Sequence, residues 1–541
     1  MPRDSVQASF GAPITSLGPP VQYLGEPARA TIERAIPYSI VPLVDSPPLR
    51  PGVIARRRPV HLQTAVVIVI LAVAIGSIGL AVLTIGIDVQ KSYNEGWNAY
   101  HAARVAAGEP LYSGDLHRLV NYPFLSFVLV AWLKPLLGNV LIIGRALNLL
   151  ALAAVALCSG LIVHRLGGRA VHMLFAAACV VGFQEIQAAD WIGTDEPQML
   201  AEAFMLAGLL CYISGPRTAL RLAAVALLLA TGGFIKHTVI AIPVAVTIDI
   251  LWHDRRAFAV WCLCLGAVFA LYVGATYVLA GGDFFRELLA PRVYHWSRLG
   301  YHAKKFLIAF KIPSLVVLAY LCVVRERATL LRAYGVIAFV AAMVFSGGDG
   351  VSYNIFLDVA VFAGIGAAFA LRYWSDRLAS LPAATVLMAV VPAIIAQPVL
   401  TKAPQTLGPL LRYRDTMARY AAQQAAFEEA KARIRKERGT VVCENLLLCF
   451  EAGRPLVLDP FSTQSMILSG QLSEAALIRD ITGHRFAAIE MPDRIFNEHR
   501  PAQIAAYLRN EGRFTEGTLR AIDQWYRPVT INAAAVLYLP R

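Results

Sequence analysis

Charged side chains are scarce in this chain of 541 residues. They make up 16% of the sequence, whereas a soluble domain usually carries about 25%. Hydrophobic residues account for 57%. Apolar stretches of roughly 18 or more residues recur between arginines and glycine-rich breaks, a pattern typical of membrane-spanning helices. The sequence therefore predicts an all-α polytopic membrane protein and excludes an ordinary soluble domain.

Several motifs of soluble enzymes are missing. The chain contains no glycine-rich phosphate loop, no GxSxG sequence and no HExxH sequence, so soluble nucleotide or hydrolase chemistry is unsupported. It also lacks CxxC pairs and cysteine–histidine spacings that bind metal. Six of the eight cysteines lie in apolar stretches, where they pack as small hydrophobic residues. The other two, Cys443 and Cys449, would either form a disulfide in an extracytoplasmic region or remain free thiols.

Arginine clusters beside the apolar stretches indicate how the chain is threaded. The net charge of +13 comes mostly from these clusters, so nucleic-acid binding is a poor explanation of it. If every cluster lies in the cytoplasm, an even number of spans must separate consecutive clusters. Three apolar stretches lie between Arg56–Arg58 and Arg165, and the short one at 122–138 contains Pro123 and Pro135. We therefore predict that 122–138 is a juxtamembrane helix on the outer surface.

This threading predicts the domain organisation. About eleven transmembrane helices are expected at 64–87, 141–163, 170–186, 197–214, 219–234, 238–252, 257–280, 306–324, 333–346, 354–371 and 379–400. The outer segments are then 88–140, 187–196, 235–237, 281–305 and 347–353. Residues 1–63, which are proline-rich and lack the features of a cleaved signal peptide, are predicted to be a disordered cytoplasmic tail. A transmembrane domain at 64–400 precedes 401–541, where a helix ended by Gly439 and short β-prone runs predict a small extracytoplasmic α/β domain.

The first outer segment carries acids that a connecting loop does not need. Asp88 follows a long uncharged stretch directly, and Glu95 comes seven residues later. A helix over 93–107 would place Glu95, Asn98 and Ala102 on one face. An acid at the membrane edge is a candidate general base. Aromatic side chains that could stack on a sugar flank this face: Trp97, Tyr100 and His101. The alternative is an interfacial aromatic belt with incidental acids.

The second outer loop is acidic. Asp190, Asp195 and Glu196 crowd about ten residues that contain no lysine or arginine. A divalent cation such as Mg²⁺ or Mn²⁺, or a protonated group, would relieve their repulsion. We expect such a cation, if present, at Asp195 and Glu196. Capping of the next helix by the same two acids is the alternative.

Basic residues on the outer side are candidates for binding an anion. Lys236 and His237 follow two glycines in the shortest outer turn, where a lysine could neutralise a phosphate or simply snorkel to the surface. The segment 281–305 is rich in basic residues, although it is predicted to lie on the outer side, where loops usually carry few of them. An anionic partner at the outer leaflet would explain Arg298 and Lys304 there, although translocated loops tolerate some basic residues.

The last outer loop is glycine-rich and leads into a span through Tyr353, Asn354 and Asp358. A carboxylate about one turn below the membrane surface usually faces a cavity. Together with Tyr122 of the NYPF segment, these three residues are predicted to line a substrate cavity. A calcium-binding loop or a plain tight turn are the alternatives.

At these residues the sequence resembles the GT-C superfamily of polytopic glycosyltransferases that use polyprenyl-phosphate sugars. It looks most like bacterial members related to the protein O-mannosyltransferase and aminoarabinose transferase families. The resemblance rests on Asp88 with the NEGWNAYHAARVAAGEPLY and NYPF segments, the acidic pair Asp195 and Glu196, Lys236 between later spans, and the terminal outer domain. The family often has two adjacent acids after the first span, whereas here Val89 follows Asp88.

The resemblance implies a reaction at the extracytoplasmic face of a bacterial inner membrane. A sugar would pass from a polyprenyl-phosphate donor to a hydroxyl of a glycan, lipid or protein acceptor, in an inverting reaction. Asp88, alone or with Glu95, would be the base. Lys236, His237, Arg298 and Lys304 would hold the donor phosphate. The alternative is a multi-span transporter or lipid flippase, although acids crowded on one surface and the lack of a sequence repeat count against it.

Overall fold

The computed structural model describes residues 58–323, 328–378, 381, 383–492, 513–532 and 535–541. These residues all belong to one compact unit, 42–541. Most of the predicted N-terminal tail, 1–63, lies outside the described residues. The prediction of its disorder and cytoplasmic location therefore stays a prediction.

Six helical segments are long and apolar enough to cross a membrane by themselves, and two bent pairs bring the number to as many as eight. The long helices are α1 (Arg58–Ser77) with α2 (Gly79–Leu83), α5 (Val140–Arg165), α6 (Ala170–Ala188), α10 (Arg255–Leu279), α14 (Ala328–Ser346) and α15 (Leu357–Leu378). The short 3-10 helix η2 (Ala189–Trp191) extends α6, and η3 (Tyr353–Phe356) precedes α15. These segments confirm a multi-span helical protein.

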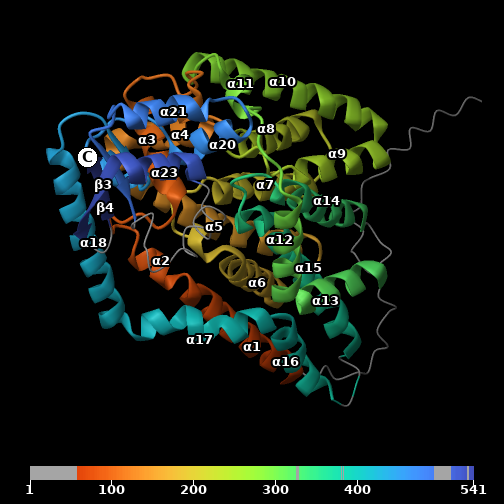
Figure 1. The fold of residues 1–541 in the computed structure, drawn as a ribbon. Coiled ribbons are helices and arrows are strands. Elements are labelled where there is room, and N and C mark those ends of the chain that lie inside the picture. The colour runs from red at the N-terminus through yellow and green to blue at the C-terminus, as the bar shows by residue number, and fades with distance from the viewer. Residues whose placement is uncertain (1–57, 324–327, 379–380, 382, 493–512, 533–534) are drawn as a thin grey trace, which may run out of the picture. The chain divides into compact units, whose positions relative to one another are not determined.

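Three further predicted spans are short helices. They are α7 (Gln198–Ile213), α8 (Ala219–Ile235) and α9 (Ala241–His253), with 16, 17 and 13 residues. Each occupies its predicted place, so the six long segments, the two bent pairs and these three fill the eleven predicted positions. Helix α15 packs against α6, α13 and α14 (Figure 1). The most apolar stretch of α15 is 89% buried, so α15 is the central helix.

Two predicted spans contain a bend between two helices. The predicted span 306–324 includes the end of α12 (Trp296–Ala309) and α13 (Lys311–Val323), which meet at 83°. The predicted span 379–400 includes α16 (Ala384–Ile395) and the start of α17 (Gln397–Leu411), which meet at 62°. The sequence predicted the two spans but neither bend. Pro313 and Pro398 follow the two breaks, and each lacks the N–H that would continue the preceding helix.

The first outer segment is largely helical, as predicted. The helix predicted at 93–107 is α3 (Tyr93–Ala106), and the juxtamembrane helix predicted at 122–138 is α4 (Leu125–Leu137). The short helix η1 (Leu116–Arg118) lies between them, and α11 (Phe284–Leu288) precedes α12. The segment 281–305 is therefore not the open loop that the sequence predicted, because α11 and most of α12 lie within it.

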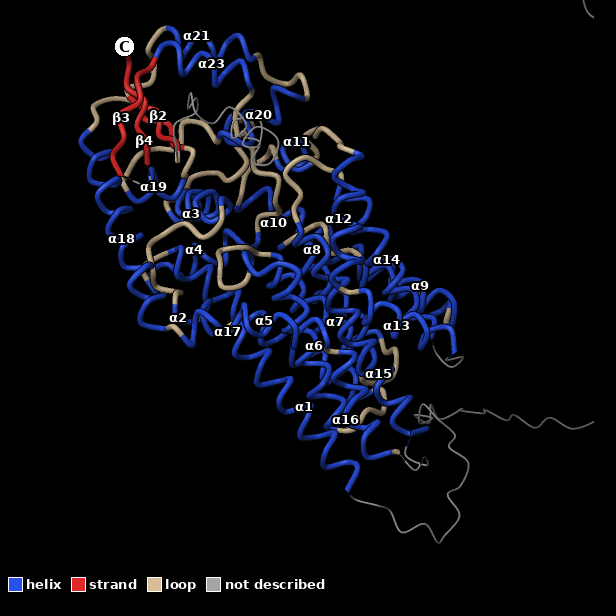
Figure 2. Tube along the Cα trace, turned by 60° about the horizontal axis from the view of Figure 1, so that its bottom comes forward, coloured by secondary structure: helices blue, strands red, loops and turns tan. Residues whose placement is uncertain are grey.

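The C-terminal region forms the predicted small domain with helices and a mixed sheet. Helix α18 (Tyr413–Lys436) ends before Gly439, which has a φ of +105°. The strands β1 (Val441–Cys443), β2 (Ala488–Met491), β3 (Tyr526–Asn532) and β4 (Ala535–Pro540) lie in the order β1-β2-β4-β3, beside α18 and α19 (Figure 2). Only β1 and β2 are parallel. The remaining helices are α19 (Leu446–Glu451), α20 (Pro460–Leu468), α21 (Glu474–Thr482) and α23 (Glu516–Trp525).

This domain packs directly on the first outer segment. Helix α19 crosses α3 at Gly96, where a Cβ atom would collide with the backbone of Leu446 and Leu447. The backbone N–H of Asp459 donates to the carbonyl of His117 over 2.7 Å. A disulfide between Cys443 and Cys449 joins β1 to α19. The structure thus confirms one of the two possibilities left open for these cysteines.

The predicted outer segments meet on one face of the helices. Backbone hydrogen bonds join Tyr112 to Ala280 over 2.8 Å and His295 to Gly347 over 2.6 Å. Tyr112, His295 and Gly347 come from three different predicted outer segments, and Ala280 is the last residue of the predicted span 257–280. The contacts therefore agree with the even number of spans placed between these segments. Which side of the membrane this face occupies stays a prediction.

Candidate functional site

A buried ion pair organises the start of the first outer segment. Arg145 of α5 donates from Nε and Nη2 to the two carboxylate oxygens of Glu95 in α3, over 2.7 and 2.8 Å. Both side chains are fully buried. The sequence analysis missed Arg145, although an arginine inside an otherwise apolar span is costly unless it is paired and is therefore a signal of a buried partner.

The same guanidinium group fixes the loop that contains Asp88. It donates to the carbonyls of Ile87 and Val89 over 2.6 and 2.8 Å. Glu95 additionally accepts from the backbone N–H of Lys91 and that of Asp195. Both oxygens of Glu95 are therefore occupied. This geometry favours a structural role for Glu95 in place of the predicted catalytic one.

Asp88 itself faces the C-terminal domain. Its side chain is half-buried, and its Oδ1 is buried without a hydrogen-bond partner among the described residues. The pKa of Glu451 in α19 is raised first by burial and then by the negative charge of Asp88. No contact between described residues joins Asp88 to Lys236. Asp88 is thus placed on a rigid loop, but apart from the predicted phosphate-binding lysine.

Lys236 lies in a buried polar cluster at the end of α8. Its Nζ donates to Oε1 of Glu196 over 2.9 Å and lies 3.4 Å from the centre of the Tyr122 ring. Asn94 donates to the other oxygen of Glu196 over 2.9 Å. Burial alone would lower the pKa of Lys236, but the Glu196 carboxylate and Tyr122 raise it overall. Lys236 therefore keeps its positive charge in a buried place.

Arg292 is a second cation beside this cluster and is half-buried; the sequence analysis did not select it. Its hydrogen bond to the carbonyl of Asp349 is long, at 3.5 Å. Burial lowers the pKa of Arg292, while the nearby charges of Tyr122 and Asp349 oppose the change. Its charge also acts on His237. The basic segment 281–305 was a signal for it, but four other cations there made the choice ambiguous.

His237 is uncharged at neutral pH. The His237 side chain lies at the surface of the protein, but desolvation by the surrounding atoms, and then the positive charges of Lys236 and Arg292, lower the pKa of His237 to about 4. It therefore offers a neutral imidazole to the site. The sequence analysis correctly placed it beside Lys236.

The two other predicted phosphate-binding residues lie elsewhere. Arg298 pairs with Asp349 over 2.9 Å, and Lys304 is exposed on α12. Tyr353 lies under the ammonium group of Lys305, at 3.4 Å from ring centre to Nζ. The geometry therefore favours Arg292 over Arg298 and Lys304 as the partner of Lys236.

The acidic loop is neutralised mainly by pairing. Glu95 and Glu196 are each paired with a cation, Arg145 and Lys236. The pKa of Asp195 is raised strongly by burial and then by the charges of Glu95 and Glu196. The raised pKa favours the protonated form of Asp195, which agrees with the second possibility that the sequence left open for this loop.

The residues predicted to bind a divalent cation do not fit one well. No group of three or more His, Cys, Asp or Glu residues is placed to hold a metal ion within the part of the chain that the structure describes. Asp190 is exposed and acts electrostatically on Glu185, whereas Glu196 is engaged by Lys236. The expected cation stays a prediction, and we assign no chemical step to it.

The aromatic residues predicted to stack on a sugar are packing residues. Trp97 contacts the rings of Tyr122 and Phe127 at centroid distances of 5.1 and 5.5 Å. His101 is fully buried. The hydroxyl of Tyr100 donates to the carbonyl of Arg454 over 2.6 Å and so attaches α3 to the C-terminal domain.

Two residues predicted to face a cavity have hydrogen-bond partners on neighbouring helices. Asn354 of η3 exchanges hydrogen bonds with Gln198 of α7 over 2.8 and 2.9 Å. Asp358 of α15 accepts a hydrogen bond from Tyr334 of α14 over 2.5 Å. The amide and the carboxylate are thus satisfied by neighbouring helices, as buried polar groups usually are. That both residues line a substrate cavity stays a prediction.

An apolar cavity adjoins the cations. It has a volume of about 250 Å³ and is lined by residues of α7 to α11 and the turns between them. His237 is the one polar side chain among its lining residues, which include Phe234, Phe269 and Phe284. The cavity therefore combines an apolar interior with a neutral imidazole that lies next to Lys236 and Arg292.

Comparison with known proteins shows that solved structures share the fold of this chain. No family model and no curated protein sequence matches the chain. Two crystal structures of ArnT from Cupriavidus metallidurans do match. The apo structure has a TM-score of 0.56 and 12% identity over 88% of this chain and 97% of ArnT. The structure bound to undecaprenyl phosphate has a TM-score of 0.53 and 14% identity over 90% and 98%. The chain has the ArnT fold.

The match to ArnT agrees with the predicted resemblance at the level of the fold alone. It also agrees with the predicted combination of a multi-span helical domain and a small terminal domain. Identities of 12% and 14% do not transfer individual residues from ArnT to this chain.

Arg145→Met should strongly destabilise this ArnT-like fold. The substitution leaves the Glu95 carboxylate buried without its cation, and breaking a buried ion pair costs about 3–5 kcal/mol. Thermal unfolding of the detergent-purified protein should therefore begin at a lower temperature. The double variant Arg145→Met/Glu95→Leu should recover part of the loss, because no unpaired charge remains. A single variant as stable as the wild type would contradict the structural role of the pair.

His237→Gln should reduce the loss of stability in acid. The folded pKa of about 4 lies below the ordinary value of 6.5, so the unfolded chain binds more protons between these values. The contribution of His237 is therefore complete above pH 6.5 and is lost as the pH falls towards 4. Melting temperatures at pH 7.5 and 4.5 should differ less in His237→Gln than in wild type. The exposed His61→Gln is the control and should retain the wild-type difference.

Proposed function

We propose that the protein is a membrane glycosyltransferase that moves a sugar from a polyprenyl-phosphate donor to an acceptor hydroxyl. The observation that carries the proposal is that His237 lines an apolar cavity and lies within the influence of two cations, the buried Lys236 and the half-buried Arg292. An amphipathic lipid phosphate needs both parts. The undecaprenyl phosphate bound to ArnT, a protein of the same fold, supports this donor class.

The donor would bind with its two chemical parts in different surroundings. Its isoprenoid chain enters the apolar cavity, where removal from water stabilises it. Its phosphate lies beside Lys236 and Arg292. Charge-assisted hydrogen bonds from these cations to the phosphate are stronger where water is largely excluded than at an exposed surface. Arg292 is well suited to this role because its described contact with Asp349 is long and weak.

The proposed reaction is a single displacement. The acceptor oxygen forms a bond to the anomeric carbon while the bond from that carbon to the phosphate oxygen breaks. The electron pair of the broken bond remains on the polyprenyl phosphate, and the two cations stabilise this leaving group. The proton of the acceptor hydroxyl passes to a carboxylate, so the anomeric configuration inverts.

Two acids are candidates for this base. Asp88 was predicted from the sequence, but its charge acts on Glu451, towards the C-terminal domain. Glu196 is hydrogen-bonded to Lys236 and therefore lies next to the proposed phosphate position. When the ammonium group turns to the phosphate, Glu196 becomes free to accept a proton. We therefore propose Glu196 as the base, with Asp88 as the alternative.

The reaction would take place at the extracytoplasmic face of a bacterial inner membrane. The C-terminal domain contacts the first outer segment, so the proposed site and this domain share a face. A lipid flippase would need a similar phosphate site, but it would not consume the donor. The sugar and the acceptor, whether glycan, lipid or protein, are left open by the proposal.

Lys236→Ala should weaken use of the donor. Loss of one charge-assisted contact of about 1.5–3 kcal/mol corresponds to roughly a tenfold to hundredfold increase in KM for the donor. The purified protein would be incubated with a panel of polyprenyl-phosphate sugars, and release of polyprenyl phosphate would be measured. Lys304→Ala removes the same charge from an exposed position and should leave the donor KM unchanged. An unchanged KM in Lys236→Ala would exclude the phosphate contact.

Glu196→Gln and Asp88→Asn should separate the two candidate bases. Removing a general base lowers kcat by about 10²–10⁴, and the acidic limb of the kcat–pH profile should disappear with it. We expect this loss in Glu196→Gln and a much smaller one in Asp88→Asn. Loss of the acidic limb in Asp88→Asn alone would assign the base to Asp88, as the sequence predicted.

A further inference from the structure

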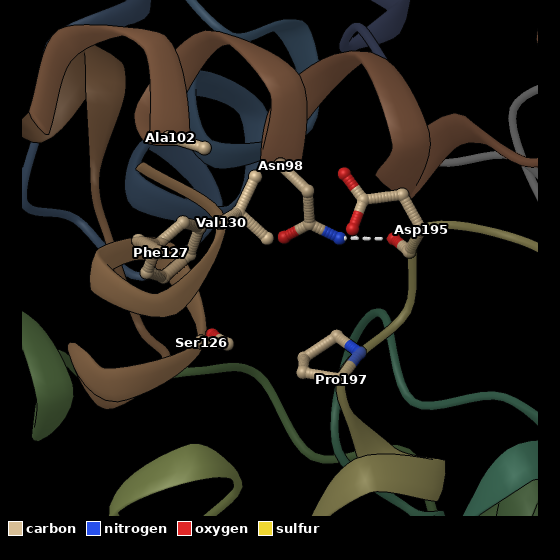
Figure 3. A pocket seen from close by; sticks show the side chains of 7 residues that line it. All are labelled: Asn98, Ala102, Ser126, Phe127, Val130, Asp195 and Pro197. Carbon is tan, nitrogen blue, oxygen red and sulfur yellow. Dashed lines mark hydrogen bonds between the residues drawn. The ribbon is translucent and has the colours of Figure 1, made fainter. Parts of the chain in front are cut away.

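A small cavity lies between α3, α4 and the acidic loop that precedes α7. Its volume is about 20 Å³, and it is lined by Asn98, Ala102, Ser126, Phe127, Val130, Asp195 and Pro197 (Figure 3). A cavity of this kind needs roughly 10–15 Å³ to hold one water molecule. The cavity is therefore large enough for one water and too small for any organic ligand.

Three oxygen atoms from three different segments belong to residues that line this cavity. They are Oδ1 of Asn98, Oγ of Ser126 and Oδ2 of Asp195, and each is buried without a hydrogen-bond partner among the described residues. The three residues are only 3%, 9% and 6% exposed. A buried polar atom without a partner costs about 1–3 kcal/mol. Three of them at one cavity therefore indicate a shared partner.

The orientation of the Asn98 amide supports this reading. Its Nδ2 donates to the backbone carbonyl of Asp195, so the oxygen of the amide must point elsewhere. Figure 3 shows the nitrogen directed at Asp195 and the oxygen directed away from that bond, towards the cavity. The cavity thus receives an acceptor that cannot be exchanged for a donor without breaking an existing hydrogen bond.

We propose that one ordered water molecule occupies this cavity and binds Asn98, Ser126 and Asp195 together. The water donates its two hydrogens to Oδ1 of Asn98 and to a carboxyl oxygen of Asp195, and it accepts the hydroxyl hydrogen of Ser126. The two hydrogens of the water and the hydroxyl hydrogen of Ser126 then each have one acceptor. Three partners is the usual number for a buried water in a protein.

This water would attach the acidic loop to α3 and α4. Asp195 is attached to α3 by its backbone N–H, which donates to Glu95, and the water adds a link from its side chain to α3 and α4. The next residue, Glu196, is the partner of Lys236. The water therefore helps to set the position of Glu196. The proposal concerns hydration of the fold and does not rest on the proposed function.

Filling the cavity with a larger side chain tests the proposal, because a hydrated cavity and a dry cavity predict opposite changes in the melting temperature. Ala102→Val places additional methyl groups in the cavity and should expel the water, leaving its three partners unsatisfied. We expect a melting temperature several degrees below that of Ala103→Val, a control with the same change in helix propensity at the next position of α3. A dry cavity would instead be filled favourably, and a higher melting temperature for Ala102→Val would overturn the proposal.

A second measurement keeps the proposal testable if Ala102→Val does not fold. A high-resolution structure of the full wild-type chain should show one peak within hydrogen-bond distance of all three oxygen atoms. In Ser126→Ala, the peak should remain with two partners and the melting temperature should fall. An empty cavity at a resolution that shows other buried waters would overturn the proposal. So would a melting temperature that rises with NaCl and not with choline chloride, because the occupant would then be a sodium ion.

Discussion

The buried pair of Arg145 and Glu95 is the interaction on which the outer half of the molecule depends. One guanidinium group holds the Glu95 carboxylate near the start of α3 and the carbonyls of Ile87 and Val89 in the loop that follows α2. A cation placed inside an apolar helix needs all of these acceptors, because each unsatisfied donor would be costly there. The pair therefore fixes the point at which the chain leaves the first span, and through Glu95 it also fixes the backbone of Asp195.

Charge balance explains how three acids can lie close together beneath the C-terminal domain. Glu95 and Glu196 each have a buried cation, and the raised pKa of Asp195 favours its protonated form. The two ion pairs, Arg145 with Glu95 and Lys236 with Glu196, differ in how many other protein groups surround the cation. Arg145 is saturated by protein groups and is structural, whereas Lys236 has a carboxylate, an aromatic face and a neighbouring arginine with few partners. Only the second pair can exchange a protein partner for a phosphate, which is why the proposed donor site lies there.

The cavity next to His237 makes one side of the site apolar. Apolar side chains of α7 to α11 line it, and in the proposed function they would surround the lipid chain while its phosphate lies beside Lys236 and Arg292. The match to ArnT over most of both chains shows that the fold is a known one. Identities of 12% and 14% carry over no residue role from ArnT.

The sequence by itself determined the class of the protein, the place of its helices and the resemblance to GT-C enzymes, because these depend on local hydropathy, basic clusters and short motifs. It also named Lys236 and His237 together as candidates for binding a phosphate. Only the tertiary structure showed that Glu95 belongs to Arg145, that Lys236 pairs with Glu196, and that Asn354 and Asp358 bind other helices. Each of these depends on which side chains from distant segments meet. A single sequence does not contain that information, because many partners have the same charge and only packing selects among them.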